Sequence, residues 1–298
     1  MNIGISSRLR FTSQFILQVS NIAMFSFFNS FGAMVKNNPN IATGIATFSI
    51  NSTVSETSTI INGANYKVYT FTNTTPNYYT ITKMNSIPTT IYYLCVGAGG
   101  SGFVCGGGAG QFKEGSISVT NSQTITLSIA PTTAAGYSGS SSTIVFSVNS
   151  TLNVTSTGGV LGTSSLGGTS GDGFAGGNTA SYGGGGGGSA GTGANGSLGG
   201  FGGNGGLPKK PTVLGISAVY PTTYWAAGGP GGYIAGNSYA GAGSGTSGFA
   251  SGKGIFLPGY TATIASNPNA RANTGSGGGS SNPANTGGSG IIILALPV

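Results

Sequence analysis

The run Thr90-Ile-Tyr-Tyr-Leu-Cys-Val-Gly-Ala-Gly-Gly-Ser-Gly102 decides the fold of this chain. Its first half is rich in β-branched and aromatic residues and predicts a buried strand, whereas its second half is a glycine loop that cannot begin a helix. The far end of the chain has the reverse order, because Gly287-Gly-Ser-Gly290 leads into the apolar run Ile291-Ile-Ile-Leu-Ala-Leu296. We therefore expect two buried strands joined by glycine-rich chain.

The composition excludes a helical protein outside the glycine-poor parts of the chain, such as the apolar N-terminal arm, which could be a helix. Of the 298 residues 59 are glycine, and each glycine inside a helix costs about 1 kcal/mol relative to alanine. Hydrophobic residues make up 38% of the chain, with 15 Phe and 13 Tyr, so it also lacks the highly charged, aromatic-poor composition of disordered proteins. This material suffices for one core and a small second one.

Residues 42–157 have the pattern of an antiparallel β-sandwich. Short runs of β-branched and aromatic residues alternate with Asn, Gly and Pro clusters, and Ile125, Leu127 and Ile129 alternate with polar residues as in a half-buried strand. Residues 290–298 are predicted to close the sandwich as its last strand. The predicted strands lie at 45–50, 66–72, 78–82, 90–96, 114–119, 123–129, 142–148, 152–155 and 291–296.

Residues 158–289 form a glycine-rich region with little other periodicity. From Gly184 to Gly205, glycine recurs at every third position, interrupted by Ala190. Three residues per turn is the period of polyproline II, and glycine on one side lets such helices approach and hydrogen-bond to one another. We expect polyglycine-II-like layered loops here; a flexible linker and collagen are the rival interpretations, and the aromatic residues and the broken, proline-free period speak against them.

Residues 1–41 differ from the rest of the chain. Arg8 and Arg10 precede an apolar segment from Phe11 to Val35, and Lys36 to Asn40 reads as a linker. Three interpretations stay open: an arm that docks on a partner or lies at a membrane interface, a cleaved signal peptide, and a transmembrane anchor, which the several Gln, Asn and Ser residues disfavour. The anchoring residues would be Phe15, Ile16, Leu17, Phe25, Phe27, Phe28 and Phe31.

The charges and cysteines predict neither nucleic-acid binding nor a disulfide framework. The net charge of +7 comes from 10 Lys and Arg against 3 Asp and Glu, and the cations are scattered instead of clustered. Cys95 lies in the apolar strand and is interpreted as a core residue. Cys105 follows the glycine loop, and the sequence leaves open whether the two are bridged.

No enzymatic site emerges from the sequence. Gly97-Ala-Gly-Gly-Ser-Gly102 matches the dinucleotide fingerprint but lacks the helix and the acidic residue that must follow it. The chain has no histidine, and Glu56, Glu114 and Asp172 are far apart in sequence. We expect a non-enzymatic protein with no catalytic residues, no cofactor and no metal.

Aromatic residues in the glycine region are the candidate binding residues. If exposed together, they could stack on sugar rings or contact a partner protein. The competing interpretation is that they pack between glycine layers as a core. These residues are Tyr224, Trp225, Tyr233 and Tyr239.

The two junctions between strand and glycine loop resemble those of the glycine-rich domain proteins of tailed phages and large DNA viruses. The resemblance rests on Tyr92-Tyr-Leu-Cys-Val96 with its following glycines, on Gly106–Gly110, and on Gly287–Leu294. It implies a virion or tail-fibre component, often an adhesin for host attachment, with polyglycine II helices that display binding tips. The chain departs from the family pattern at Gly97-Ala-Gly-Gly-Ser101 and Phe103-Val-Cys105, where many members have almost continuous glycine, and in its apolar N-terminal arm.

Together these observations predict a viral structural protein, capsid- or fibre-associated. Its expected partners are other virion proteins, in an oligomer or lattice, and host surface carbohydrate, with membrane contact through the N-terminal arm. The alternatives are a receptor-binding fibre tip and a secreted glycine-rich coat or matrix protein of a cell.

Overall fold

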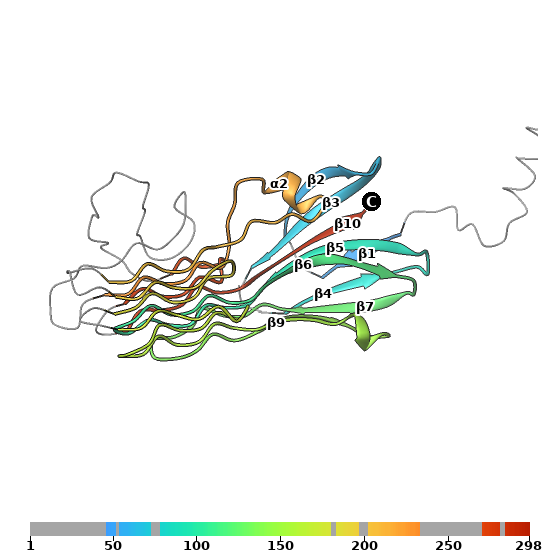
Figure 1. Cartoon of the computed structure of the whole chain (residues 1–298). Coiled ribbons are helices and arrows are strands. Elements are labelled where there is room, and N and C mark those ends of the chain that lie inside the picture. Colours follow the sequence, from blue (N-terminus) through green and yellow to red (C-terminus); the bar gives the residue numbers. More distant parts are fainter. Residues whose placement is uncertain are drawn as a thin grey trace, which may run out of the picture. The chain divides into compact units, whose positions relative to one another are not determined.

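A computed structural model describes residues 46–51, 54–72, 78–179, 183–196, 202–232, 270–280 and 284–298. The regular structure of this part is almost entirely antiparallel β, in two sheets of five strands (Figure 1). This confirms the predicted mainly β sandwich. The predicted arm at residues 1–41 lies outside the described residues.

The first sheet has the order β1-β4-β7-β8-β9 and the second the order β2-β3-β10-β5-β6, with every neighbouring pair antiparallel. The only helices in the described part are one 3-10 turn, η1, and one four-residue helix, α2. The elements are β1 (Phe48–Ile50), β2 (Ser55–Ile61), β3 (Ala64–Thr72), β4 (Tyr78–Lys83), β5 (Thr89–Val96), β6 (Phe112–Val119), β7 (Gln123–Ser128), β8 (Ser142–Phe146), η1 (Ser150–Leu152), β9 (Val154–Ser156), α2 (Ile216–Val219) and β10 (Ile291–Pro297).

The strand β10 is central to the second sheet, where it pairs with β3 on one side and β5 on the other. Its even residues, such as Ile292 and Leu294, face the core between the sheets, and its odd residues, such as Ile291 and Ile293, face a second cluster on the outer side. Six consecutive residues, Ile291 to Leu296, are buried. An unbroken apolar run is what a strand covered on both faces requires.

The second cluster forms because the chain from Val213 to Ala226 covers the outer face of the second sheet. The helix α2 contributes Ile216, and the Trp225 indole packs edge-on against Tyr220, with 5.6 Å between the ring centroids. Tyr220 also shares a hydrogen bond with Thr70 of β3, at 2.7 Å between the hydroxyl oxygens. This cover is why β10, at the centre of the second sheet, is buried on both faces.

Two buried serines hold the sheets together where the strands end. The Ser142 hydroxyl of β8 donates to the Val96 carbonyl of β5 at 2.8 Å, and the Ser156 hydroxyl of β9 donates to the Cys95 carbonyl at 2.7 Å. Packed sheets normally lie about 10 Å apart, so such bonds require the sheets to converge. Beyond this point the two sheets no longer enclose side chains, and their backbones bond directly to one another.

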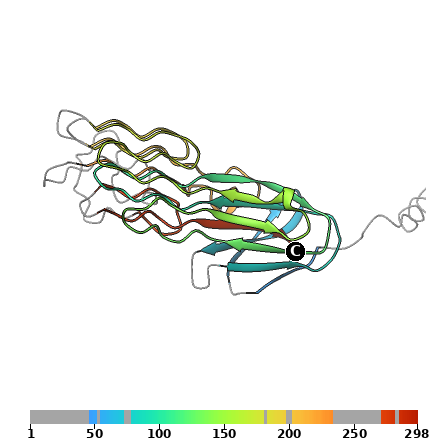
Figure 2. The same ribbon diagram turned by 90° about the horizontal axis from the view of Figure 1, so that it is seen from below.

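Beyond the serines, the chain forms what we call the glycine lattice: twelve described segments in three layers of four (Figures 1 and 2). Each segment bonds to its neighbours in its own layer and in the adjacent layer. Residues 130–134 run along one edge, bonded to the 284–290 segment. The layers consist of residues 137–140, 157–163, 166–171 and 174–179; of residues 97–102, 105–111, 183–189 and 190–196; and of residues 284–290, 270–280, 225–232 and 202–209.

The hydrogen bonds of the lattice have a three-residue period. In the central segment 105–111, Gly106 donates to Gly184, Gly107 to Gly278 and Gly108 to Val160, each in a different segment, and the cycle then repeats. A backbone with three residues per turn points successive N–H groups about 120° apart, as in polyproline II. The 105–111 segment is therefore hydrogen-bonded to six neighbouring segments. Its N–H groups donate to residues 157–163, 183–189 and 270–280. Its carbonyl groups accept from residues 97–102, 166–171 and 225–232.

A second central segment, residues 183–189, has the same arrangement. It donates to three segments and accepts from three others, and it shares two of its neighbours, 166–171 and 225–232, with the 105–111 segment. Two adjacent centres of a hexagonal array must share two neighbours in this way. The lattice is thus one continuous structure, and its segments are connected along the chain to β5, β6, β7, β9 and β10. Residues 97–111 belong to it as fully as the residues beyond 158 do.

Close backbone approach is what selects glycine in the lattice. A Cβ added at Gly186 would lie within 3.0 Å of the Gly107 carbonyl oxygen, and one added at Gly108 would meet the Thr169 carbonyl in the same way. Neither glycine has a φ in the left-handed region. These positions need glycine because a neighbouring chain occupies the space of the side chain, so the requirement is tertiary.

Candidate functional site

The glycine loop that matches the dinucleotide fingerprint is a part of the lattice. All six of its N–H groups, from Gly97 to Gly102, donate to backbone carbonyls of other segments at 2.8 to 3.1 Å. A phosphate-binding loop needs such groups free to point at the ligand. Residues 97–102 therefore cannot cradle a phosphate in this structure, which agrees with the rejection of a nucleotide site from the sequence.

Each of the three acids has a structural contact of its own. Glu56 is paired with Lys67 at 2.8 Å on the exposed edge of the second sheet, and the pairing lowers the pKa of Glu56 and raises that of Lys67. The Glu114 carboxylate accepts from the Thr212 and Val213 N–H groups and so fixes the segment that leads to α2. In the described residues no three metal-binding side chains of the types His, Cys, Asp and Glu gather.

The third acid, Asp172, accepts from the Phe112 N–H at 3.0 Å, where β6 leaves the lattice. Burial raises the pKa of its carboxyl, and the bond from Phe112 opposes the rise. Because the folded-state pKa is raised, this group contributes stability below its unfolded pKa and loses that contribution as the pH rises through the folded value. Its contacts explain a structural role; the absence of enzyme activity stays a prediction.

Both cysteines are free and buried. The Cys95 thiol lies between the sheets, and burial raises its pKa to about 12. The Cys105 sulfur lies 2.9 Å from the Thr179 hydroxyl in the lattice. The interpretation of Cys95 as a core residue is confirmed, and the bridge that the sequence left open is not formed.

Lys83 is the buried charge of the sandwich. Its side chain has no exposed surface, and its ammonium donates to the Asn85 carbonyl. Within the described residues it has no carboxylate partner. Desolvation lowers the pKa of Lys83, because burial disfavours the charged form.

We expect Lys83→Met to stabilise the protein at pH 7, by on the order of 1 kcal/mol, because methionine fills the same space without a desolvated charge. Between the lowered folded-state pKa and the unfolded value of 10.5, the unfolded chain binds the Lys83 proton more tightly, so wild-type stability should rise with pH there. Urea unfolding from pH 7 to 10 measures both effects. Equal pH slopes in the variant and the wild type would refute this account.

The four candidate aromatic residues do not form one exposed patch in the described part. The Trp225 side chain is 3% exposed and belongs to the cluster over the second sheet, while its backbone pairs with Lys209. No sugar ring can stack on it there. Trp225 is a core residue, but it packs against the outer face of the second sheet instead of between glycine layers. Tyr224 is half-buried, and Tyr233 and Tyr239 lie outside the described residues.

The candidate anchoring residues Phe15, Ile16, Leu17, Phe25, Phe27, Phe28 and Phe31 also lie outside the described residues. In the part of the chain that is described, no helix has the length and apolar character needed to cross a bilayer.

The outer face of the first sheet is an uncharged surface that the sequence analysis did not identify. Because Ile81, Ile125 and Ile144 point into the core, the alternate residues of the same strands point outward. Threonines dominate this set, and the register places Thr126 opposite both Thr80 and Val145. The outward residues are Tyr78, Thr80, Thr82, Thr124, Thr126, Ser128, Thr143, Val145 and Thr155.

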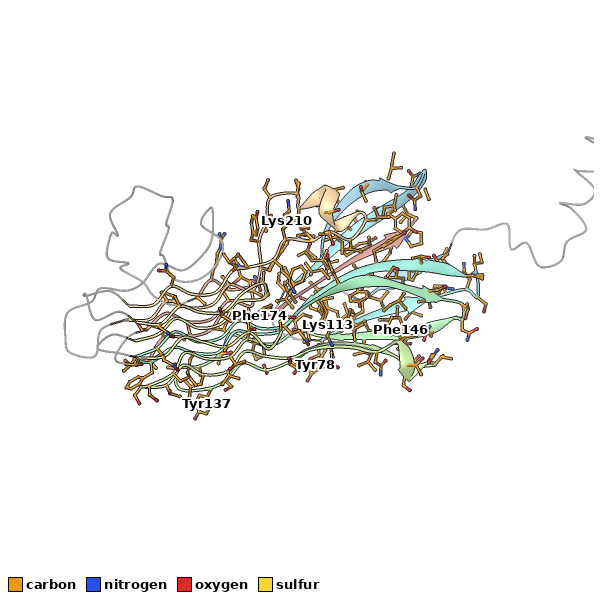
Figure 3. All side chains as sticks on the ribbon, viewed as in Figure 1. Tyr78, Lys113, Tyr137, Phe146, Phe174 and Lys210 are labelled. Atoms are coloured by element: carbon orange, nitrogen blue, oxygen red, sulfur yellow. The ribbon has the colours of Figure 1, made fainter. Side chains whose placement is uncertain are left out.

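The first layer of the lattice continues this surface, because β9 leads directly into residues 157–163. Val160 is 48% exposed and Tyr137 is 68% exposed. Tyr137 and Tyr78 point to the same side of the molecule, whereas Lys210 lies on the opposite side (Figure 3). We call the outward side of β4, β7, β8, β9 and residues 137–163 the threonine face; its described residues include no charged side chain on the outside.

Comparison with known protein families identifies the family of this chain. The model of a family described as a glycine-rich domain covers residues 73–297, well over half of the chain. No curated protein and no solved structure matches the chain.

Proposed function

This chain belongs to the glycine-rich domain family, and we propose that it is a non-enzymatic structural protein of a virus particle, capsid- or fibre-associated. In this proposal the lattice is a stiff spacer that extends from the sandwich. The proposed contacts of the molecule are other virion proteins and host surface glycans.

The observation that carries this proposal is the closed hydrogen bonding of the lattice. Its two central segments each bond to six neighbours and carry almost no side chains. Apart from the buried Cys105 and Ser189, such an interior offers no groups for acid-base, nucleophilic or metal chemistry. A backbone whose hydrogen bonds are satisfied on all sides gives rigidity without a hydrophobic core. Rigid display is what a particle component exposed to the environment needs.

The viral assignment rests on the resemblance of the two strand–glycine junctions, at Val96 and at Ile291, to phage and large-virus proteins. A receptor-binding fibre tip is the alternative role within a virus particle. The aromatic patch proposed for it would lack Trp225, because Trp225 is buried in the cluster over the second sheet. A secreted coat or matrix protein of a cell is the alternative outside it. These assignments differ in where the native protein is found and in what happens to residues 1–36.

The test is detection of the protein in purified particles, followed by its intact mass. We expect the protein to co-purify with particles through a density gradient, with a mass that includes Met1–Lys36, as a docking arm requires. A protein that is found only in the medium, with a mass beginning near Lys36, would support the secreted alternative and overturn the proposal. A glycan array with the full chain then tests host carbohydrate as a partner.

A further inference from the structure

We propose that the threonine face is a self-association surface, which a second copy of this chain covers with the same face. This inference goes beyond the proposed function, because it holds for a viral or a cellular protein alike. Three observations carry it: the distribution of charge, the composition of the face and its size.

Charge is absent from the threonine face and present elsewhere. The cations of the described part other than Lys83 are Lys67 and Lys113 of the second sheet, Arg271 in the lattice layer farthest from the face, and Lys209 and Lys210 at the end of that layer. Lys83 comes from a strand of the face, but it points inward and is fully buried. Pairings through the other described surfaces would bring these cations of two copies together, whereas contact between two threonine faces does not.

The composition of the face matches the centre of a protein interface. Such centres are depleted in charged residues and enriched in aromatic ones. The face exposes Tyr78 at 63%, Tyr137 at 68% and Val145 at 40%, surrounded by threonines whose χ1 rotamers are stiff. Stiff side chains lose little conformational entropy on contact, so burying this face costs less than burying a surface of long charged residues.

The size of the face is sufficient for a stable dimer. The four strands of the face, about 4.8 Å apart, are roughly 15 Å wide, and β7 together with the 157–163 segment gives a length of roughly 40 Å. The projected area is therefore about 600 Å² on each copy, or about 1,200 Å² for the pair, which is the lower end of the range of specific, stable interfaces. A two-fold axis would place the same residues on both sides.

The test uses the full chain in sedimentation velocity from about 1 to 100 μM. We expect the wild type to dimerise, and the double variant V145K/V160K to weaken dimerisation at least 100-fold, because each substitution brings an ammonium group into the contact. The matched control is Ser118→Lys, at an exposed position of β6 outside the face. The control should dimerise as the wild type does, and thermal melting establishes that all three proteins are folded.

Cross-linking through the face gives an independent readout. Both native cysteines are buried, so a cysteine introduced as Thr126→Cys is the accessible thiol. A short bis-maleimide should link Thr126→Cys chains into dimers and leave the wild type unlinked. The proposal is overturned if the wild type is monomeric at 100 μM, or if V145K/V160K dimerises as tightly as the wild type. It is also overturned if the chain dimerises only after deletion of residues 1–44, because the N-terminal arm and not a second copy would then cover the face.

Discussion

Replacing Gly186 by alanine is expected to destabilise the protein by at least about 3 kcal/mol, which would lower its melting temperature by roughly 6 °C or more. The new methyl group would overlap the Gly107 carbonyl, with the Gly107 carbon and the Gly106 oxygen next to it. All three contacts are backbone atoms that are held in the lattice by hydrogen bonds. No rotamer change can relieve the overlap, so the 105–111 and 183–189 segments would have to separate.

The matched control is Gly191→Ala, also in the lattice. A Cβ at this position meets only the Leu207 side chain, at 3.7 Å, and its φ lies outside the left-handed region. We expect a change within about 1 kcal/mol, because alanine restricts the unfolded chain without a clash. Differential scanning calorimetry of the two variants measures the contrast. Equal melting temperatures would mean that the layers are not packed at hydrogen-bonding distance around residue 186.

Alanine substitution of Ile292 or of its neighbour Ile293 should lower the free energy of unfolding by a similar amount, about 2 to 5 kcal/mol in each case. Ile292 points into the core between the sheets and Ile293 into the cluster formed with α2 and Trp225, and both are fully buried. Each truncation leaves a cavity among side chains that cannot fully collapse. Urea unfolding of the two single variants measures the costs.

The comparison strand is β7, which is covered on one face only. Ile125→Ala should lower the free energy of unfolding as much as either β10 variant does. Thr126→Ala, at the adjacent outward position, should change it by no more than about 1 kcal/mol. A small effect of Ile293→Ala, like that of Thr126→Ala, would contradict the burial of the second sheet by the segment from Val213 to Ala226. Comparison of the Ile292 and Ile293 variants with the Ile125 and Thr126 variants therefore tests whether the outer face of the second sheet is a hydrophobic core.

Most of the strands could be predicted because their signal is local. Alternation identifies β7, and the unbroken apolar run identifies β10 as covered on both faces. The strand β2 was missed, since Ser55–Ile61 is a polar edge strand with little alternation. The signal that could have found it is Asn62-Gly63, which follows it and has φ values of 50° and 80°, as a two-residue hairpin turn requires.

The candidate site was less predictable, because exposure depends on residues distant in sequence. Nothing near Trp225 in the sequence shows that its indole packs under Tyr220 and beside the second sheet. The threonine face was overlooked for a related reason. Its residues are spaced as ordinary outward positions of separate strands, and only the pairing of β4, β7, β8 and β9 assembles them into one surface.

The sequence by itself determined the strand content, the sandwich class, the glycine character of the connections and the scarcity of reactive side chains. It also contained the three-residue period of the lattice, because that period is a property of a single glycine-rich backbone. Only the tertiary structure decided which segments bond to which, since a glycine carries no side chain to encode a partner. Which lattice segments hydrogen-bond to one another is fixed instead by the strands to which they are connected. The pairing of these strands sets where each glycine segment begins and how close its neighbours lie.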